Sequence, residues 1–168
     1  MNPDIIKKFT IDFYDNGKIT FSSKPCEVKN KEFLYWYKYS ITLESDLLQM
    51  LLNDEISIHS CILKTHEYLE VFIKCFGIYK YNLVHKNHFI NKIINIFNIS
   101  LMENHVRSIK FLDYYFENKR YPDTYMDDEL QITKKDLYDL YESVSSVIYK
   151  NISLSKRDKT KLDKIKIF

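Results

Sequence analysis

The chain contains very few residues that end helices or form tight turns: only 2 glycines and 3 prolines occur among its 168 residues. Antiparallel sandwiches and barrels depend on tight turns, which draw heavily on these two residue types. Apolar side chains recur instead at helical spacing along most of the chain. The sequence therefore predicts a mainly α protein, and its length is sufficient for one hydrophobic core.

Five segments carry the apolar pattern of an amphipathic helix, and they cover about residues 31–53, 55–76, 86–97, 101–118 and 134–151. The second is expected to end at Gly77, in a left-handed C-cap. Ser100 and Glu103 have capping-box spacing at the start of the fourth helix, and Thr133 to Asp136 forms the cap of the fifth. Short links between these segments predict an antiparallel up-and-down bundle of four to five helices.

The two ends of the chain do not follow this pattern. Residues 8–23 alternate apolar and polar side chains on either side of Asp15-Asn16-Gly17, which is typical of a β-hairpin. A lone hairpin is marginal in water, so we expect it to pack on the helices or to extend a partner's sheet. We divide the chain into an N-terminal β-hairpin extension (1–30), a helical bundle (31–152) and a Lys-rich tail (153–168), expected to be loosely held or a frayed helix.

Charge, cysteine and glycine content argue against several classes of protein. The net charge is only +2, too balanced to predict nucleic-acid binding by itself. Cys26, Cys61 and Cys75 lack the spacing of metal-binding pairs, so free thiols in a reducing compartment are expected. No segment approaches the ~20 apolar residues of a membrane span, and no signal peptide is recognised. We expect a cytoplasmic protein without a cofactor, and with 2 glycines no phosphate-binding glycine loop is plausible.

One part of the chain is more specific than a helical pattern. Leu112-Asp113-Tyr114-Tyr115, near the end of the predicted 101–118 helix, is followed by Arg120-Tyr121-Pro122-Asp123. Upstream, Glu70 and Lys74 lie one helical turn apart, and Tyr81-Asn82-Leu83 follows in a connector. With these motifs, residues 31–152 resemble a HEPN domain, particularly the subgroup that contains Arg-Tyr-Pro-Asp. The hairpin and the tail lie outside the resemblance.

The resemblance implies a four-helix up-and-down bundle that forms a homodimer through a helical face. Such domains are often encoded beside, or fused to, a minimal nucleotidyltransferase, which makes that enzyme an expected partner and a toxin–antitoxin or defence system an expected context. Many members are ribonucleases that use an Arg and a His four to six residues apart. Here no His follows Arg107, Arg120 or Arg157 at that spacing, and Tyr125 stands where a His is expected.

The candidate binding residues surround Arg120. Its guanidinium can bind a phosphate or a partner's carboxylate in bidentate fashion, or it can pair with Asp113 or Asp123 and fix the corner of the chain. The nearby tyrosines can stack on a base, or they can close the core or a dimer seam. The predicted nucleotide- or partner-binding set is Arg120, Tyr121, Asp123, Tyr125, Tyr115 and Lys119. We assign no catalytic residue and no metal ligand, because the histidine pairs His59/His66 and His85/His88 lack further ligands at suitable spacing.

Three hypotheses of function follow. The leading one is a non-catalytic, HEPN-like homodimeric module that binds a nucleotidyltransferase partner, a nucleotide or RNA. The second is a metal-independent ribonuclease in which Arg120 acts with Tyr125, or with a histidine brought close by the fold, such as His66 or His105. Tyrosine, with an ordinary pKa of about 10, is a poor base near neutrality. The third is a scaffold protein that binds its partner through the hairpin.

Overall fold

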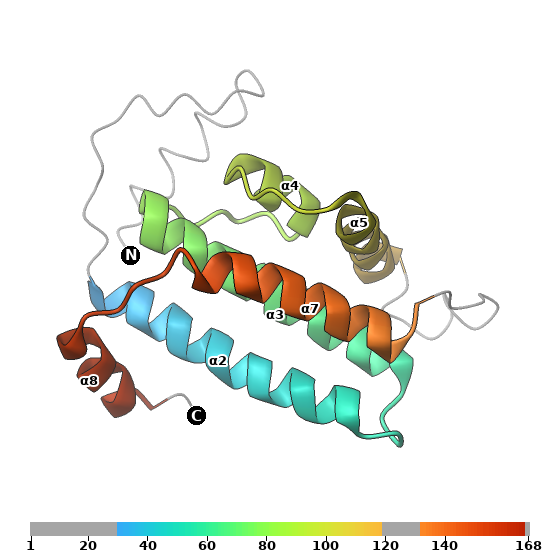
Figure 1. Ribbon diagram of the computed structural model, residues 1–168, viewed down its shortest axis with the longest axis horizontal. Helices are drawn as coiled ribbons and strands as arrows, with labels where there is room; N and C mark the ends of the chain where they lie inside the picture. The colour runs from blue at the N-terminus through green and yellow to red at the C-terminus, as the bar shows by residue number, and fades with distance from the viewer. Residues whose placement is uncertain (1–29, 119–131, 167–168) are drawn as a thin grey trace.

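The computed structural model describes residues 30–118 and 132–166 (Figure 1). Within these ranges it contains six helices and no strand, which confirms the mainly α prediction. They are α2 (Asn30–Leu52), α3 (Ile58–Tyr81), α4 (Ile90–Ile96), α5 (Glu103–Asn118), α7 (Lys134–Tyr149) and α8 (Lys156–Lys164). None of these helices is both long and apolar enough to cross a membrane. The hairpin predicted in residues 8–23 lies outside the described ranges.

Helix α3 occupies the centre of the described structure. Figure 1 shows α2, α3 and α7 running side by side, with α4 and α5 on the other side of α3. Helix α3 packs against all four of these helices, whereas α8 packs against α2. Because α3 has neighbours on so many sides, it is buried along most of its length, from Cys61 to Ile78.

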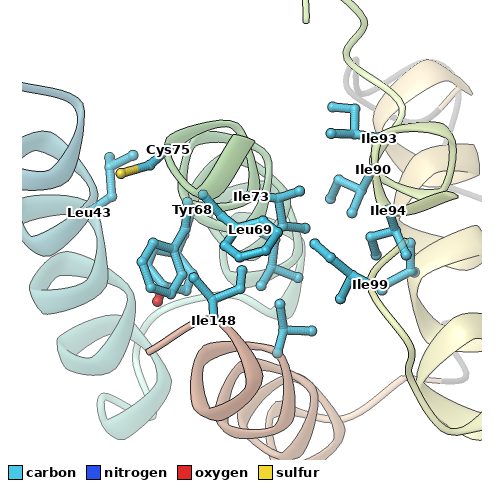
Figure 2. Packing of buried hydrophobic residues seen from close by; sticks show 14 of the residues in the cluster. Leu43, Tyr68, Leu69, Ile73, Cys75, Ile90, Ile93, Ile94, Ile99 and Ile148 are labelled. Carbon is cyan, nitrogen blue, oxygen red and sulfur yellow. The ribbon is translucent and has the colours of Figure 1, made fainter. Parts of the chain in front are cut away.

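The apolar core surrounds α3. Figure 2 shows Leu43 of α2 on one side of α3, Ile148 of α7 on another, and Ile90 and Ile93 of α4 on a third. The inward stripe predicted for the last long helix is confirmed at four positions that are fully buried: Leu137, Leu140, Val144 and Ile148. Cys61 and Cys75 are fully buried free thiols, as expected for small core residues, and burial raises the pKa of both.

Gly77 does not end α3, so that part of the prediction is wrong. The helix continues for another turn to Tyr81 and is capped by Asn82, whose φ of 56° and ψ of 34° place it in the left-handed region. The backbone amide of Asn82 donates to the carbonyls of Gly77 and Ile78. A Cβ on residue 77 would lie 2.2 Å from Cζ of Phe97. Glycine is needed here because an aromatic ring packs directly on the helix backbone.

Helix α4 begins at Ile90, later than the predicted residue 86. In the preceding connector, two side chains accept hydrogen bonds from backbone amides. Asn87 N–H donates to Nδ1 of His85 (3.0 Å), and Phe89 N–H donates to Oδ1 of Asn87 (2.7 Å). Such local bonds compete with helical hydrogen bonding. The connector therefore stays non-helical until Phe89, the N-cap residue.

The starts of the last two long helices differ in how well the sequence predicts them. Helix α5 begins at Glu103 rather than 101, and the Met102 carbonyl accepts the His105 amide (3.0 Å). Ser100 is exposed and lies outside this first turn. The capping box of α7 is confirmed, because the Thr133 hydroxyl accepts the Asp136 amide and the Asp136 carboxylate accepts the Thr133 amide. This hydrogen bonding from Thr133 lowers the pKa of Asp136.

The tail is not loosely held where it is described. Ser155 caps α8 by accepting the Asp158 amide (3.1 Å). The Tyr79 hydroxyl of α3 donates to the Ser153 carbonyl (3.1 Å) and accepts the Ser153 amide (3.0 Å). Leu162 then packs against the core from α8. The tail is thus fixed to the bundle at Tyr79 and along α2.

A half-buried carboxylate links α2, α3 and α7, the three helices that run side by side. Glu44 of α2 accepts the hydroxyls of Tyr149 (2.5 Å) and Tyr141 (2.8 Å) of α7, and that of Tyr68 of α3 (3.4 Å). The Tyr68 hydroxyl also pairs with Ser145 of α7 (2.8 Å). Burial raises the pKa of all three tyrosines, and the Glu44 carboxylate adds to the increase for each.

Replacing Gly77 with alanine tests the contact with Phe97. Alanine is the better helix former by about 1 kcal/mol, yet the clash should outweigh this and lower the free energy of unfolding by about 1–3 kcal/mol. Urea denaturation followed by circular dichroism measures the change. Lys110→Ala, at an exposed position of α5, should change stability by at most about 0.5 kcal/mol. A more stable Gly77→Ala variant would contradict the packing described here.

Alkaline titration of the phenol absorbance tests the Glu44 cluster. Tyr68, Tyr141 and Tyr149 should stay neutral beyond a pH of about 10, where exposed tyrosines ionise. Because folding raises their pKa, their contribution to stability is complete below that pH and is lost as the pH rises further. Late ionisation should therefore coincide with loss of helical circular dichroism, and Tyr149→Phe should remove one late-ionising group. Ionisation of every tyrosine in a single step near pH 10, with the helices intact, would rule this out.

Candidate functional site

Three ionisable side chains form a polar row along the buried helix α3. His66, Glu70 and Lys74 follow one another at intervals of four residues and so lie on one face. His66 has no exposed surface, Lys74 is 5% exposed, and the Glu70 side chain is 13% exposed. Buried charges are unfavourable unless they are paired and hydrogen-bonded. The partners of this row therefore determine what packs against α3.

The first partner is Asp113 of α5, which is itself buried. Its Oδ1 lies 3.1 Å from Nε2 of His66 and accepts the Ile90 amide (2.8 Å), while Oδ2 accepts the Asn91 amide (2.9 Å). Those amides open α4, where no side chain of the N-cap residue bonds to the helix. A carboxylate at this position satisfies the unpaired amides and complements the helix dipole. Asp113 thus ties together α3, α4 and α5.

The Asp113 contact determines where His66 carries its proton. The carboxylate accepts two backbone amides, so Nε2 of His66 must act as the donor. Nδ1 is then the remaining ring nitrogen, and it is a buried atom without a hydrogen-bond partner, 3.9 Å from Oε2 of Glu70. The imidazole also stacks on Phe116 of α5, with ring centroids 4.1 Å apart and planes 2° from parallel. The His66 end of the polar row is therefore held by Asp113 and Phe116 of α5.

The second partner is the connector before α4. Oε1 of Glu70 accepts from Nζ of Lys74 (2.6 Å) and pairs with Nδ1 of His88 (2.9 Å). The His88 side chain is 67% exposed, so this ion-pair group opens onto the surface. Burial, together with the Lys74 ammonium, lowers the pKa of nearby His85. A neutral His85 is consistent with its Nδ1 accepting a backbone amide.

We refer to His66, Glu70, Lys74, His88 and Asp113 as the polar cluster. Its accessible end is the His88 imidazole, and its buried end is the junction of α3, α4 and α5. An imidazole oriented by a carboxylate is a group that proteins use for proton transfer and as a nucleophile. Among the described residues, no group of three His, Cys, Asp or Glu could hold a metal ion.

Of the six predicted binding residues, only Tyr115 lies in a described range. It is 2% exposed, and its hydroxyl lies 2.5 Å from Nδ1 of His59 at the start of α3. This burial favours the reading in which Tyr115 closes the core over the one in which it stacks on a base. The other five lie in residues 119–131, outside the described ranges.

The polar cluster itself was not predicted as a site. Within the described ranges, Asp113 pairs with His66 and with the amides of α4, and its predicted pairing with Arg120 lies outside those ranges. His105, one of the two histidines considered for catalysis, is 9% exposed and its Nδ1 lies 3.0 Å from the Ser143 hydroxyl. A signal was present, because Asp113 sits among the inward-facing residues of its helix, where an unpaired carboxylate would be unfavourable.

A separate small pocket lies where the start of α2 meets the end of α3 and the lead into α8. It has a volume of about 130 Å³, and Phe33, Ile78, Tyr79 and Asp158 are among the residues that line it. No residue of the polar cluster contributes to its walls. The pocket and the cluster are therefore independent features.

No protein-family model matches the chain, and neither a curated protein nor a solved structure gives a significant match. The described structure thus establishes a mainly helical protein with six helices, and no family beyond that. The likeness to HEPN domains depends on the motif residues alone.

Replacing Asp113 with asparagine tests its structural role. The change removes the charge that pairs with His66 and that complements the start of α4, so we expect a loss of about 3 kcal/mol in unfolding free energy. Denaturation with urea measures the loss, and amide exchange of Ile90 and Asn91 reports on α4 directly. Glu117→Gln, at an exposed position of the same helix, should leave both unchanged. Equal stability of the two variants would show that Asp113 does not hold this junction.

Proposed function

We propose that the chain is a HEPN-like binding module that works as a homodimer and has no catalytic activity of its own. Its proposed ligand is a nucleotidyltransferase partner, a nucleotide or RNA, in a toxin–antitoxin or defence context. In this proposal α2, α3, α5 and α7 correspond to the four helices of an up-and-down bundle, and α4 lies between the second and third. The mainly helical fold and the motif residues support it.

The observation that carries the proposal is the way in which Asp113 is fixed. Leu112 is fully buried, Asp113 is hydrogen-bonded to α3 and α4, and Tyr115 is buried against His59. Three of the first four motif residues are therefore packed where α3, α4 and α5 meet, and Tyr114 is exposed. Arg120 follows only a few residues later in the sequence, and its guanidinium is suited to a phosphate or a carboxylate.

The ribonuclease alternative receives little support from His66 and His105, the two histidines named for it. Cleavage needs a base that can reach the 2′-hydroxyl of the RNA. His66 has no exposed surface and His105 is 9% exposed, and both imidazoles are hydrogen-bonded within the fold. Neither is available to a bound RNA strand.

Binding and association can be measured on the full chain. We expect a dimer by light scattering, and binding of ATP, GTP, or a labelled single-stranded RNA. Arg120→Ala should weaken binding about tenfold or more, the scale of one lost charge-assisted pair of hydrogen bonds. Arg157→Ala, an arginine outside the motif, is the matched control. Equal effects of the two variants, or a monomer that binds none of these probes, would contradict the proposal.

Incubation of the protein with total RNA in the presence of EDTA separates the module from the ribonuclease. We expect no cleavage even at high protein concentration. Cleavage that disappears in Arg120→Ala would replace the binding module with a metal-independent nuclease.

A further inference from the structure

We propose that His88 accepts a phosphoryl group on Nε2 and that Glu70 and Lys74 prepare it for this reaction. The inference goes beyond the proposed function, because it uses none of the residues assigned to ligand binding around Arg120. It depends on the exposed end of the polar cluster, where a surface imidazole is held by a nearly buried carboxylate.

His88 is the one histidine in the chain whose side chain is largely exposed. All five histidines lie in the described ranges. His66 and His105 are buried, while His59 and His85 are half-buried. The His88 side chain is 67% exposed, so its imidazole can reach a reactive group on another molecule. A general base usually works inside an enclosed site, where its substrate is held and water is excluded. This degree of exposure suits an acceptor better than such a base.

The contact with Glu70 orients the ring and sets its tautomer. Nδ1 of His88 lies 2.9 Å from Oε1 of Glu70, and a carboxylate can only accept a hydrogen bond. The proton is therefore on Nδ1, and the lone pair is on Nε2, on the other side of the ring. A carboxylate behind an imidazole is the usual way in which proteins fix a reactive histidine.

Lys74 makes this carboxylate compatible with an incoming phosphoryl group. Its ammonium lies 2.6 Å from the same oxygen of Glu70 that holds His88. Without that cation, the negative charge of Glu70 would repel the negative oxygens of a phosphoryl donor. Lys74 is 5% exposed, and its partner is mostly buried, so screening by salt is weak at this pair.

An acyl phosphate can donate the phosphoryl group without any further reactant. The Nε2 lone pair attacks phosphorus, an N–P bond forms, and the bond between phosphorus and the acyl oxygen breaks. The carboxylate leaves with that electron pair, and nothing is oxidised or reduced. The Nδ1 proton stays between His88 and Glu70, whose charge stabilises the positive charge that develops on the ring.

The test uses acetyl phosphate with the full chain, and N-acetylhistidine as the reference for an ordinary imidazole. We expect one acid-labile, base-stable phosphoryl group at His88, located by mass spectrometry and seen as a phosphoramidate by phosphorus NMR. It should form about 10–100-fold faster than on the reference, which is the scale of a supporting hydrogen bond to a functional histidine. His88→Asn should abolish it.

Glu70→Gln should reduce the rate to that of the reference, whereas Glu67→Gln on the same helix should not change it. Because Glu70→Gln leaves Lys74 unpaired, a double variant with Lys74→Met provides a second test with the same expected loss, and circular dichroism checks that both stay folded.

A His88 rate equal to that of the reference, or no effect of either Glu70 variant, would overturn the proposal. RNA cleavage in EDTA that is lost in His88→Asn, without a phosphoryl adduct, would reassign His88 as a base. The Arg120→Ala variant should react normally, which separates this test from that of the proposed function.

Discussion

The fold depends on pairing the charges of a helix that has almost no solvent-facing side. Helix α3 is packed against α2, α4, α5 and α7, yet it carries His66, Glu70 and Lys74 on one face. Uncompensated, each of these groups would cost several kcal/mol in a buried position. Asp113 from α5 and His88 from the connector supply the missing partners. Together with the apolar core, those contacts hold the connector, α4 and α5 against α3.

The helices themselves could be predicted because apolar periodicity is a local property of the sequence. The end of α3 could not, because Gly77 has two physical explanations that look identical in the sequence. Glycine after an apolar run serves as a left-handed cap, or it allows another group to approach the backbone closely. Only the fold shows that the Phe97 ring fills the space of the absent Cβ and that Asn82 provides the left-handed residue.

The polar cluster was beyond sequence analysis for a different reason. His66 and Asp113 are 47 residues apart, and no periodicity links one buried polar residue to another on a distant helix. What the sequence did contain was the anomaly: a carboxylate among inward-facing positions of α5. Such a residue is a reason to expect a buried partner, although the partner's identity depends on the packing. The binding set around Arg120 lies almost wholly outside the described ranges, so that part of the site stays a prediction.

The position of Asp113 also changes what the motif can mean. In the sequence, Leu112 to Asp123 reads as one functional unit. In the structure, three of the four residues in its first half are a buried leucine, a carboxylate that caps α4, and a buried tyrosine beside His59, whereas Tyr114 is exposed. A likeness in that half therefore supports a shared architecture more than a shared activity. In our proposal, specificity for a ligand depends on the second half of the motif, while His88 is an exposed group that the motif does not include.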